Sequence, residues 1–215
     1  NVITLYPNGT LIENVAIFDN VDSGTYTFDA AVYIGGVGND GEYTILKNIT
    51  IANNEGMYGI SYDGIENEHD LNIINSVIWN NQQQDETAQI VFGHGSNSPA
   101  YNINVKHSLI EGGADAISYY SEGQTNASVQ WDSSNLTSYP YFNDPDNGDY
   151  SLSNYSPMIG AGAMSVTIEG VSYDAPTTDV LGNARPNPSG TSPDIGAYES
   201  SESAADYNPH KYVAT

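Results

Sequence analysis

A short acidic loop holds the densest set of side chains that could bind a metal ion. The stretch DPDNGD, residues 144–149, contains Asp144, Asp146 and Asp149 together with an asparagine and a glycine. Calcium binds about six to eight hard oxygen ligands, and carboxylates in one tight loop supply such oxygens. The same residues also fit an Asx-turn, in which carboxylates accept hydrogen bonds from backbone N–H groups. The sequence therefore predicts either a calcium site or a structural turn here.

Proton abstraction from an acidic sugar needs a basic side chain, and the chain has only four Lys and Arg residues: Lys47, Lys106, Arg185 and Lys211. Lys47 and Lys106 flank equivalent turns two repeats apart, about 10 Å by strand spacing, and need not share a groove. For Arg185 we expect an ion pair with Asp194 or Glu199. Because the bases do not converge, the sequence assembles no lyase site, and we assign no catalytic residue.

Hydrolysis of a glycosidic bond would need two carboxyl groups, an acid and a base. The Gly-His-Gly around His94 resembles one element of the polygalacturonase family, where it accompanies Asn-Thr-Asp, Asp-Asp and Arg-Ile-Lys motifs. None of these three partner motifs occurs in the chain. We therefore interpret His94 as a turn residue. The four histidines also lack the spacing of a transition-metal site.

An internal repeat indicates the architecture that positions these side chains. One phrase recurs as LIENVAIFDN (11–20), ILKNITIANN (45–54), NIINSVIWNN (72–81) and, weakened, VKHSLIEGG (105–113). Between the copies lie short alternating strands that end close to glycine: AAVYIGG, YGISYDG, AQIVFGHG and DAISYYSEG. A third strand leads into each following copy, and no helical periodicity intervenes. The pattern predicts an all-β, right-handed parallel β-helix with about three strands in each coil.

Strand alternation predicts which side chains fill the core of this β-helix. The expected inward positions are Ile12, Val15, Ile17, Leu46, Ile49, Ile51, Ile73, Ser76 and Ile78, and in the second phrase Val32, Ile34, Ile60, Tyr62, Ile90, Phe92, Ile117 and Tyr119. Asn14, Asn48 and Asn75 align where the strand bends, with His107 in the fourth copy. Asparagine tolerates that turn conformation. We expect stacked side-chain amides there, forming an asparagine ladder from coil to coil.

The outward positions depart from the repeat. The alternation predicts two outward columns, Phe18–Ala52–Trp79–Glu111 and Ala16–Thr50–Val77–Leu109. Apolar side chains on an outer wall mark either a covered surface or a binding surface. A loop of the same chain, residues 82–87 or part of 124–175, could cover them. Alternatively, a polysaccharide or a partner protein binds at Trp79, Val77, Leu109 and Phe18, since flat aromatic rings suit the apolar faces of sugars.

Charge and composition exclude several classes of partner. Among 215 residues, 27 Asp and Glu outnumber four Lys and Arg, which gives a formal net charge of -23. Such a surface repels the phosphates of nucleic acid, and it is also repelled by anionic membranes. No apolar run approaches the ~20 residues of a membrane span, so we expect no direct membrane insertion. The chain has no cysteine, which excludes disulfides and thiol chemistry.

The repeat rhythm fails after about residue 122, which divides the chain into three expected parts. Residues 1–123 form coils, 124–200 form an irregular cap over the last coil, and 201–215 form a linker or tail. The stretches YPYFNDPDNGDYSLSNYSPMIGAGA and DVLGNARPNPSGTSPDIGAYE resemble the C-terminal signature of bacterial secreted parallel β-helix proteins with pectate-lyase-like folds. The resemblance implies secretion or the cell surface, with a sorting or anchoring domain after residue 200. It implies no activity, because fold does not determine function.

These observations favour a non-catalytic adhesin or stalk that binds a glycan or a partner protein along its outer faces. Because the sequence opens inside the repeat, we expect further coils upstream. One alternative is therefore a fragment of a polysaccharide lyase or glycoside hydrolase whose active coils lie upstream. A purely structural spacer is a second alternative.

Overall fold

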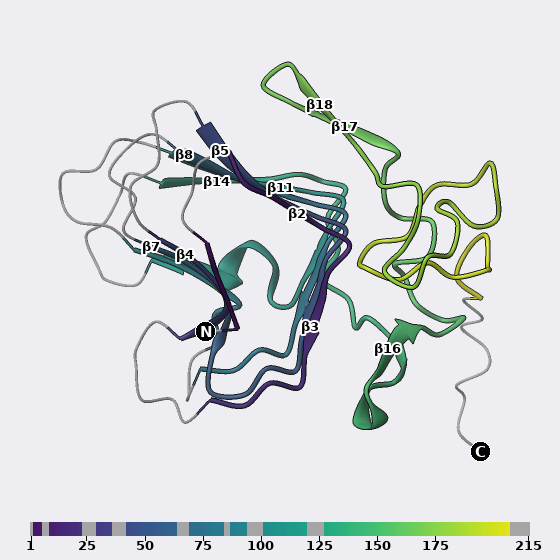
Figure 1. The fold of residues 1–215 in the computed structure, drawn as a ribbon, viewed down its shortest axis with the longest axis horizontal. Helices are drawn as coiled ribbons and strands as arrows, with labels where there is room; N and C mark the ends of the chain where they lie inside the picture. The colour runs from purple at the N-terminus through teal and green to yellow at the C-terminus, as the bar shows by residue number, and fades with distance from the viewer. Residues whose placement is uncertain are drawn as a thin grey trace.

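Three parallel β-sheets run along a stack of coils, and each coil adds one strand to each sheet (Figure 1). The computed structural model describes residues 2–5, 9–22, 29–35, 42–63, 69–83, 87–93, 101–119 and 127–206. Sheet A contains β1 (Ile3–Leu5), β4 (Ala30–Gly35), β7 (Tyr58–Asp63), β10 (Ile90–Gly93) and β13 (Ile117–Tyr119). Sheet B contains β2 (Leu11–Glu13), β5 (Glu42–Lys47), β8 (His69–Ile74), β11 (Tyr101–Lys106) and β14 (Ala127–Trp131). Sheet C contains β3 (Ala16–Phe18), β6 (Thr50–Ala52), β9 (Val77–Trp79) and β12 (Leu109–Ile110).

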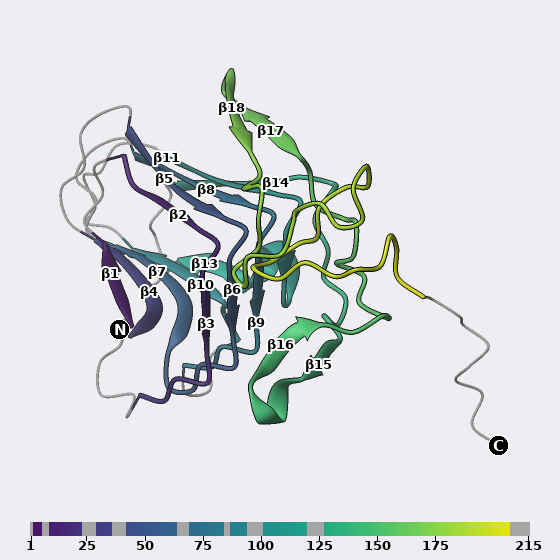
Figure 2. The same cartoon turned by 45° about the vertical axis from the view of Figure 1, so that its right-hand side comes forward.

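The chain passes from sheet B to sheet C to sheet A and then to the next coil, as Figure 2 shows for successive strands. This arrangement confirms the predicted right-handed parallel β-helix with three strands in each coil. Within the described ranges the helical elements are two 3-10 turns, η1 (Gly113–Ala116) and η2 (Pro145–Asn147). No helix among the described residues has the length and apolar character needed to cross a membrane.

The core follows the predicted alternation. Residues at equal positions lie directly above one another, as Ile17, Ile51 and Ile78 do in sheet C. The main core cluster also contains Leu46, Ile49, Ile73, Val32, Ile34, Ile60, Tyr62, Ile90, Phe92 and Ile117, and Ile12, Val15 and Tyr119 pack against it. Ser76 takes the inward place that Ile49 holds one coil earlier, and its hydroxyl accepts a hydrogen bond from the Ile49 N–H at 3.3 Å. The stack is therefore filled with matched apolar layers, except where buried serines such as Ser76 bond to the backbone.

Each bend from sheet B to sheet C is made by one residue in the left-handed region. Asn14, Asn48, Asn75 and His107 have φ angles of 54°, 51°, 48° and 48°. Asparagine adopts this conformation more readily than most residues, because its short polar side chain can hydrogen-bond locally. The alignment of His107 with the three asparagines is thus confirmed.

The side chains at this bend form one rung of the expected coil-to-coil ladder, and that rung is long. Asn75 donates to the side-chain oxygen of Asn48 over 3.5 Å, which is too long for a strong bond. The short bonds of the bend residues leave the coils instead. Asn75 donates to the carbonyl of Ala163 at 2.8 Å and accepts from its N–H at 2.9 Å. The bend asparagines bind the C-terminal part of the chain.

A true amide ladder lies at the opposite corner, where sheet C ends. Asn20 donates to Asn54 at 2.8 Å, Asn54 to Asn81 at 2.7 Å, and Asn81 to Gln89 at 3.0 Å, all through side-chain amides. Asn54 and Asn81 are fully buried. Each also donates to a backbone carbonyl of the coil before it, Asn54 to Ile17 and Asn81 to Ile51. Inward-facing amides therefore satisfy the backbone of this corner.

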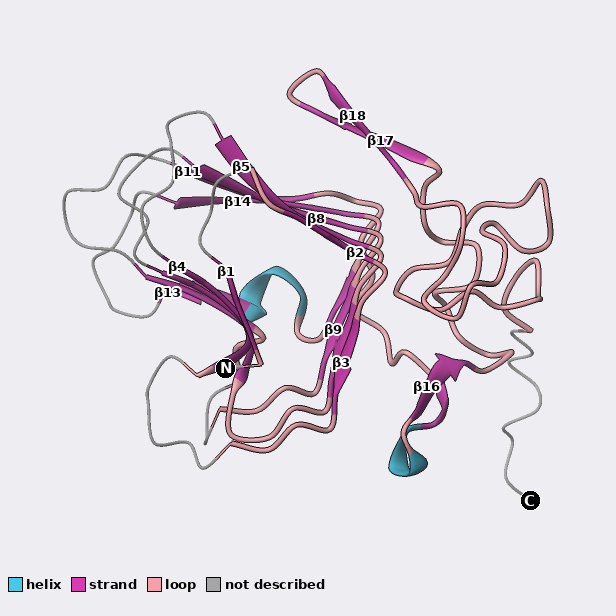
Figure 3. Ribbon diagram, viewed as in Figure 1, coloured by secondary structure: helices cyan, strands magenta, loops and turns pink. Residues whose placement is uncertain are grey.

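The coils continue past the expected boundary at residue 123. Strand β14 pairs in parallel with β11 in sheet B, and Leu136 forms a bridge with Leu109. The C-terminal segment, defined here as residues 137–206, follows. Figure 3 shows that most of it is loop, with two antiparallel hairpins. They are β15 (Phe142–Asp144) with β16 (Asp149–Leu152), and β17 (Ser165–Ile168) with β18 (Val171–Asp174).

This segment packs along the side of the stack, against sheet C and the B–C bend (Figure 1). Its contacts reach from the last bend to the first, since Ala161 contacts His107 and Thr178 contacts Asn14. The irregular segment expected as a cap therefore lies along the side of the stack. The apolar outer columns of sheet C explain this position, because they offer a surface to bury along the whole stack.

A buried ion pair organises the C-terminal segment. The Arg185 guanidinium Nε lies 2.8 Å from the Glu199 carboxylate, and both side chains are completely buried. Arg185 also donates to the side-chain oxygen of Asn14 at 3.2 Å and to the carbonyl of Gly196 at 3.1 Å. The predicted pair with Glu199 is thus present. Asp194 instead accepts the N–H groups of Gly160 at 2.7 Å and Ser200 at 2.6 Å.

Candidate functional site

A groove opens beside Trp79, between the end of sheet C and the β15–β16 hairpin. Its volume is about 410 Å³. The coils contribute Asn53, Trp79, Asn80 and Glu111, and the C-terminal segment contributes Tyr139, Phe142, Pro145 and Asp146. Figure 2 shows the hairpin lying close to β9. The groove, called here the Trp79 groove, therefore exists only because the C-terminal segment packs on the stack.

The backbone turn after sheet C places amides at the rim of this groove. Asn53 and Asn80 follow β6 and β9 directly, with left-handed φ angles of 53° and 52°. The next residues, Asn54 and Asn81, point into the buried ladder, so Asn53 and Asn80 lie outside it. Asn80 donates its side-chain amide to the Asn53 oxygen at 2.8 Å. Two linked amides thus stand next to the indole of Trp79.

Aromatic rings form the other lining of the Trp79 groove. The rings of Trp79 and Tyr139 meet edge to face, with centroids 5.5 Å apart. Tyr139 meets Tyr141 in the same way at 5.0 Å. Trp79 is half-buried, whereas Tyr139 is 52% exposed. Edge-to-face packing fixes the orientation of the rings but does not stack them face on face. Rings held in this way can contact the flat apolar face of a ligand.

Two carboxylates complete the lining, and one of them has a structural role. Glu111 accepts the backbone N–H of Asn80 at 2.7 Å and the Gln89 side-chain amide at 3.2 Å. Both bonds end on the same carboxyl oxygen, Oε2. Asp146 lies exposed on η2.

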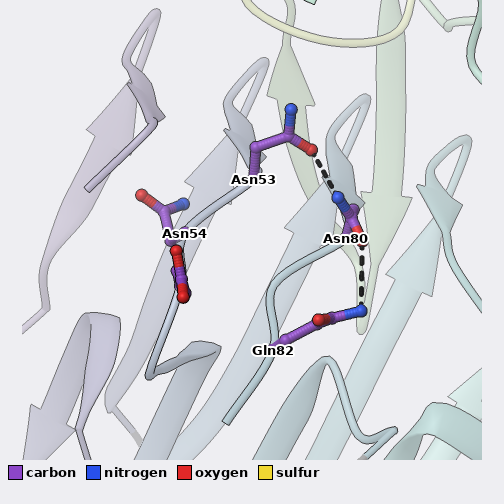
Figure 4. Close-up of a pocket in the computed structure, with 5 residues that line it drawn as sticks. Asn53, Asn54, Asn80 and Gln82 are labelled. Carbon is purple, nitrogen blue, oxygen red and sulfur yellow. Dashed lines mark hydrogen bonds between the residues drawn. The ribbon is translucent and has the colours of Figure 1, made fainter. Parts of the chain in front are cut away.

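A second, more polar groove adjoins the first. It has a volume of about 260 Å³ and is lined by Asn53, Asn54, Glu55, Asn80 and Gln82. Asn53 and Asn80 line both grooves. Figure 4 shows the amides of Gln82, Asn80 and Asn53 linked in a row. We call it the amide groove.

The structure separates the four apolar residues predicted to bind a ligand. Val77 and Leu109 are fully buried against Leu152, Met158, Ile159 and Ile195 of the C-terminal segment. Phe18 stacks on Tyr150 with ring centroids 4.5 Å apart. Binding of a ligand at Val77 and Leu109 was therefore a wrong prediction, and the alternative of coverage by the same chain is correct for them. Of these four residues, Trp79 lines the groove described above.

The acidic loop forms the tip of the β15–β16 hairpin. Asp144 accepts the Asn147 side-chain amide at 2.8 Å, and Asp149 accepts the backbone N–H of Ser151 at 3.0 Å. These bonds are of the kind expected for the turn interpretation. Across the described residues, no three His, Cys, Asp or Glu side chains are grouped as a metal site. A calcium site at Asp144, Asp146 and Asp149 stays a prediction.

The two lysines of the coils hold the β17–β18 hairpin. Lys47 donates to the carbonyl of Asp174 and lies 3.0 Å from the Glu13 carboxylate. Lys106 donates to the carbonyl of Thr167 at 3.3 Å. The two ammonium groups thus hold the β17–β18 hairpin of the C-terminal segment against sheet B. His94 and Lys211 lie outside the described residues.

A third groove, of about 320 Å³, lies between sheet B and this hairpin. It is lined by Asn104, Lys106, Gln130, Trp131, Asp132, Thr167, Ile168 and Glu169. The backbone N–H and the side chain of Ser134 hold the pKa of the Asp132 carboxyl below its usual range. Carboxylates beside Lys106 would repel the uronate that a polysaccharide lyase must bind. This groove therefore gives no support to a lyase.

The chain matches no protein-family model, no curated protein and no solved structure in comparisons with each.

Sequence reasoning identified Trp79 but missed most of its neighbours. Tyr139 and Phe142 lie about sixty residues further along the chain, and Asn53 and Asn80 are not among the residues predicted to bind. A usable signal was present in the repeat itself. The first three copies end in two polar residues, Asp19–Asn20, Asn53–Asn54 and Asn80–Asn81. Such pairs predict one turn residue in the left-handed region and one inward amide.

Proposed function

We propose that this chain is a non-catalytic β-helix segment, displayed outside the cell, that binds polysaccharide in the Trp79 groove. Extracellular display is supported by the resemblance of residues 139–199 to the signature of secreted β-helix proteins. Binding is supported by the lining of the groove. Adhesion to a glycan surface is the biological role that follows.

The observation that carries the proposal is the meeting of aromatic rings and polar side chains in one groove. Trp79 and Tyr139 offer apolar faces, while Asn53 and Asn80 offer amides. Ligand sites typically combine an apolar lining with a few placed polar groups, in volumes of about 300–1,000 Å³. A sugar ring has an apolar C–H face and hydroxyls at its edge, so it matches both kinds of lining.

A structural spacer would not need this groove. An enzyme would need catalytic side chains in addition to the rings and amides that line it. Within the described residues, Glu111 is held as an acceptor by Asn80 and Gln89. Lys47 and Lys106 are directed to the β17–β18 hairpin. A hydrolase or lyase with its active coils upstream is the remaining alternative. Turnover of a bound polysaccharide by this chain would favour it.

Binding to a glycan array, compared between wild type and Trp79→Ala, tests the proposal. We expect the wild type to bind a defined set of glycans and Trp79→Ala to lose about ten-fold or more in affinity, since an aromatic platform is removed. Trp79→Phe, which retains a ring, should bind with intermediate strength. Leu181→Ala alters an exposed side chain outside the groove and serves as the control. If the wild type binds no glycan, or if Trp79→Ala binds as well as wild type, the proposal is wrong.

A further inference from the structure

We propose that the ligand is a linear, uncharged oligosaccharide that runs from the Trp79 groove into the amide groove. This inference rests on the proposed function and specifies its ligand. The ligand is defined by two properties, its length and its lack of carboxylates.

The two grooves adjoin each other. Asn53 and Asn80 line both of them, one from each of two successive coils. The amide groove, at about 260 Å³, falls below the usual range of about 300–1,000 Å³ for a separate ligand site. It is therefore better understood as an extension of the larger Trp79 groove than as an independent pocket. A ligand that fills both must be longer than one that fills the first.

The chemistry changes along this path. The Trp79 groove presents rings, whereas the amide groove presents side chains that both donate and accept hydrogen bonds. Gln82 donates to Asn80 at 3.4 Å, and Asn80 donates to Asn53 at 2.8 Å (Figure 4). Each amide has two N–H donors and an oxygen with two lone pairs, so these two bonds use only part of the capacity. Sugar hydroxyls, which also donate and accept, fit such a row.

Charge determines which sugars are accepted. Glu111 and Asp146 line the Trp79 groove, and Glu55 lines the amide groove, while none of the described lining residues is Lys or Arg. The whole chain carries a formal net charge of -23. A uronate would meet carboxylates without a compensating cation, which is unfavourable even in partly screened surroundings. The site therefore selects uncharged hexose or pentose chains.

Isothermal titration with chains of different length tests the inference. The probes are the disaccharide and hexasaccharide of cello-, xylo- and manno-oligosaccharides, with oligogalacturonate as the charged probe. The protein is studied as wild type, Trp79→Ala and Gln82→Ala. Gln130→Ala, an exposed glutamine in the groove on sheet B, is the matched control.

We expect the hexasaccharide of one neutral series to bind more tightly than its disaccharide. Gln82→Ala should weaken hexasaccharide binding about five-fold, the value of one lost hydrogen bond, and leave the disaccharide unchanged. Trp79→Ala should weaken both lengths, and Gln130→Ala neither. Oligogalacturonate should bind more weakly than every neutral chain that binds.

The outcomes distinguish this inference from the proposed function. If both lengths bind equally and Gln82→Ala has no effect while Trp79→Ala does, the extension is overturned and the proposed function stands. Tighter binding of oligogalacturonate than of the neutral chains would overturn the requirement for an uncharged ligand. If the wild type binds none of the oligosaccharides, the proposed function fails together with this inference.

Discussion

The side chain of Asn14 donates a hydrogen bond to the carbonyl of Thr178 at 2.7 Å, although 164 residues separate them in sequence. Asn14 makes the first described bend from sheet B to sheet C, and Thr178 belongs to the C-terminal segment. The same left-handed backbone that turns the coil directs the amide outward. Bend residues therefore serve two purposes, because they shape the coils and fix the segment that builds the Trp79 groove.

Close docking of this segment predicts that Gly196→Ala destabilises the fold. Gly196 has φ +104°, and an added Cβ would lie 3.0 Å from Thr50 Oγ1 and 3.2 Å from Val77 Cγ1. We expect the free energy of unfolding to fall by about 2–4 kcal/mol, from backbone strain and crowding together. Urea denaturation measures the change.

Gly190→Ala is the matched control, because Gly190 has φ +91° but no atom within 4 Å of an added Cβ. It should show the backbone strain alone, about 1–2 kcal/mol. If Gly196→Ala and Gly190→Ala lose equal free energy of unfolding, Gly196 does not pack closely against sheet C.

The buried ladder predicts a second loss of stability, in Asn81→Ala. The Asn81 amide accepts from Asn54 at 2.7 Å and donates to the carbonyl of Ile51 at 3.1 Å. Removal of the Asn81 amide leaves the Asn54 amide and the Ile51 carbonyl buried without this partner. We therefore expect the free energy of unfolding to fall by about 2–4 kcal/mol. Asn80→Ala, which removes the half-buried amide beside it, should cost less. A larger loss for Asn80→Ala than for Asn81→Ala would contradict the ladder.

The sequence predicted the coils well because a period of two and a repeated phrase fix register directly. Ile17, Ile51 and Ile78 could be aligned from their phrases alone, and they stack as aligned. The shorter amide bonds lie in a second ladder, at Asn54 and Asn81, which was not predicted. The repeat shows that Asn48 and Asn54 recur, but it does not show which way each side chain points. The Trp79 groove could not be predicted, because Tyr139 approaches Trp79 only through long-range packing of an irregular segment.

The buried carboxyl of Asp194 predicts a pH dependence. Burial raises its pKa to about 7, and repulsion by Glu199 adds to this, although the N–H groups of Ser200 and Gly160 and the nearby Arg185 oppose it. An unfolded Asp has a pKa of about 3.9. Between these values the folded chain holds a proton that the unfolded chain has lost. The free energy of unfolding therefore falls as pH rises through this window, by at most about 1.4 kcal/mol per pH unit.

Carbon-13 NMR of the Asp194 carboxyl, followed against pH, measures this directly. We expect a midpoint near the value of about 7 given by burial. Asp194→Asn should lose that signal and flatten the dependence of unfolding free energy on pH. A carboxyl that titrates near about 4, the ordinary range for Asp, would contradict the expectation.

Calcium removal tests the acidic loop. Because Asp144 and Asp149 accept hydrogen bonds from Asn147 and Ser151 within the hairpin, we expect EDTA to leave the melting temperature unchanged. Thermal unfolding with EDTA and with added calcium measures this. A melting temperature that rises with calcium in wild type, but not in Asp146→Asn, would instead establish the calcium site.

The most direct test of the account is the fluorescence of Trp79 during a glycan titration. The chain has two tryptophans, Trp79 and Trp131, so Trp131→Phe leaves the emission of Trp79 alone. With a neutral hexasaccharide that binds this variant in calorimetry, we predict a saturable change in Trp79 emission with the same dissociation constant. Binding by calorimetry with no change in Trp79 emission would place the ligand elsewhere and contradict the account.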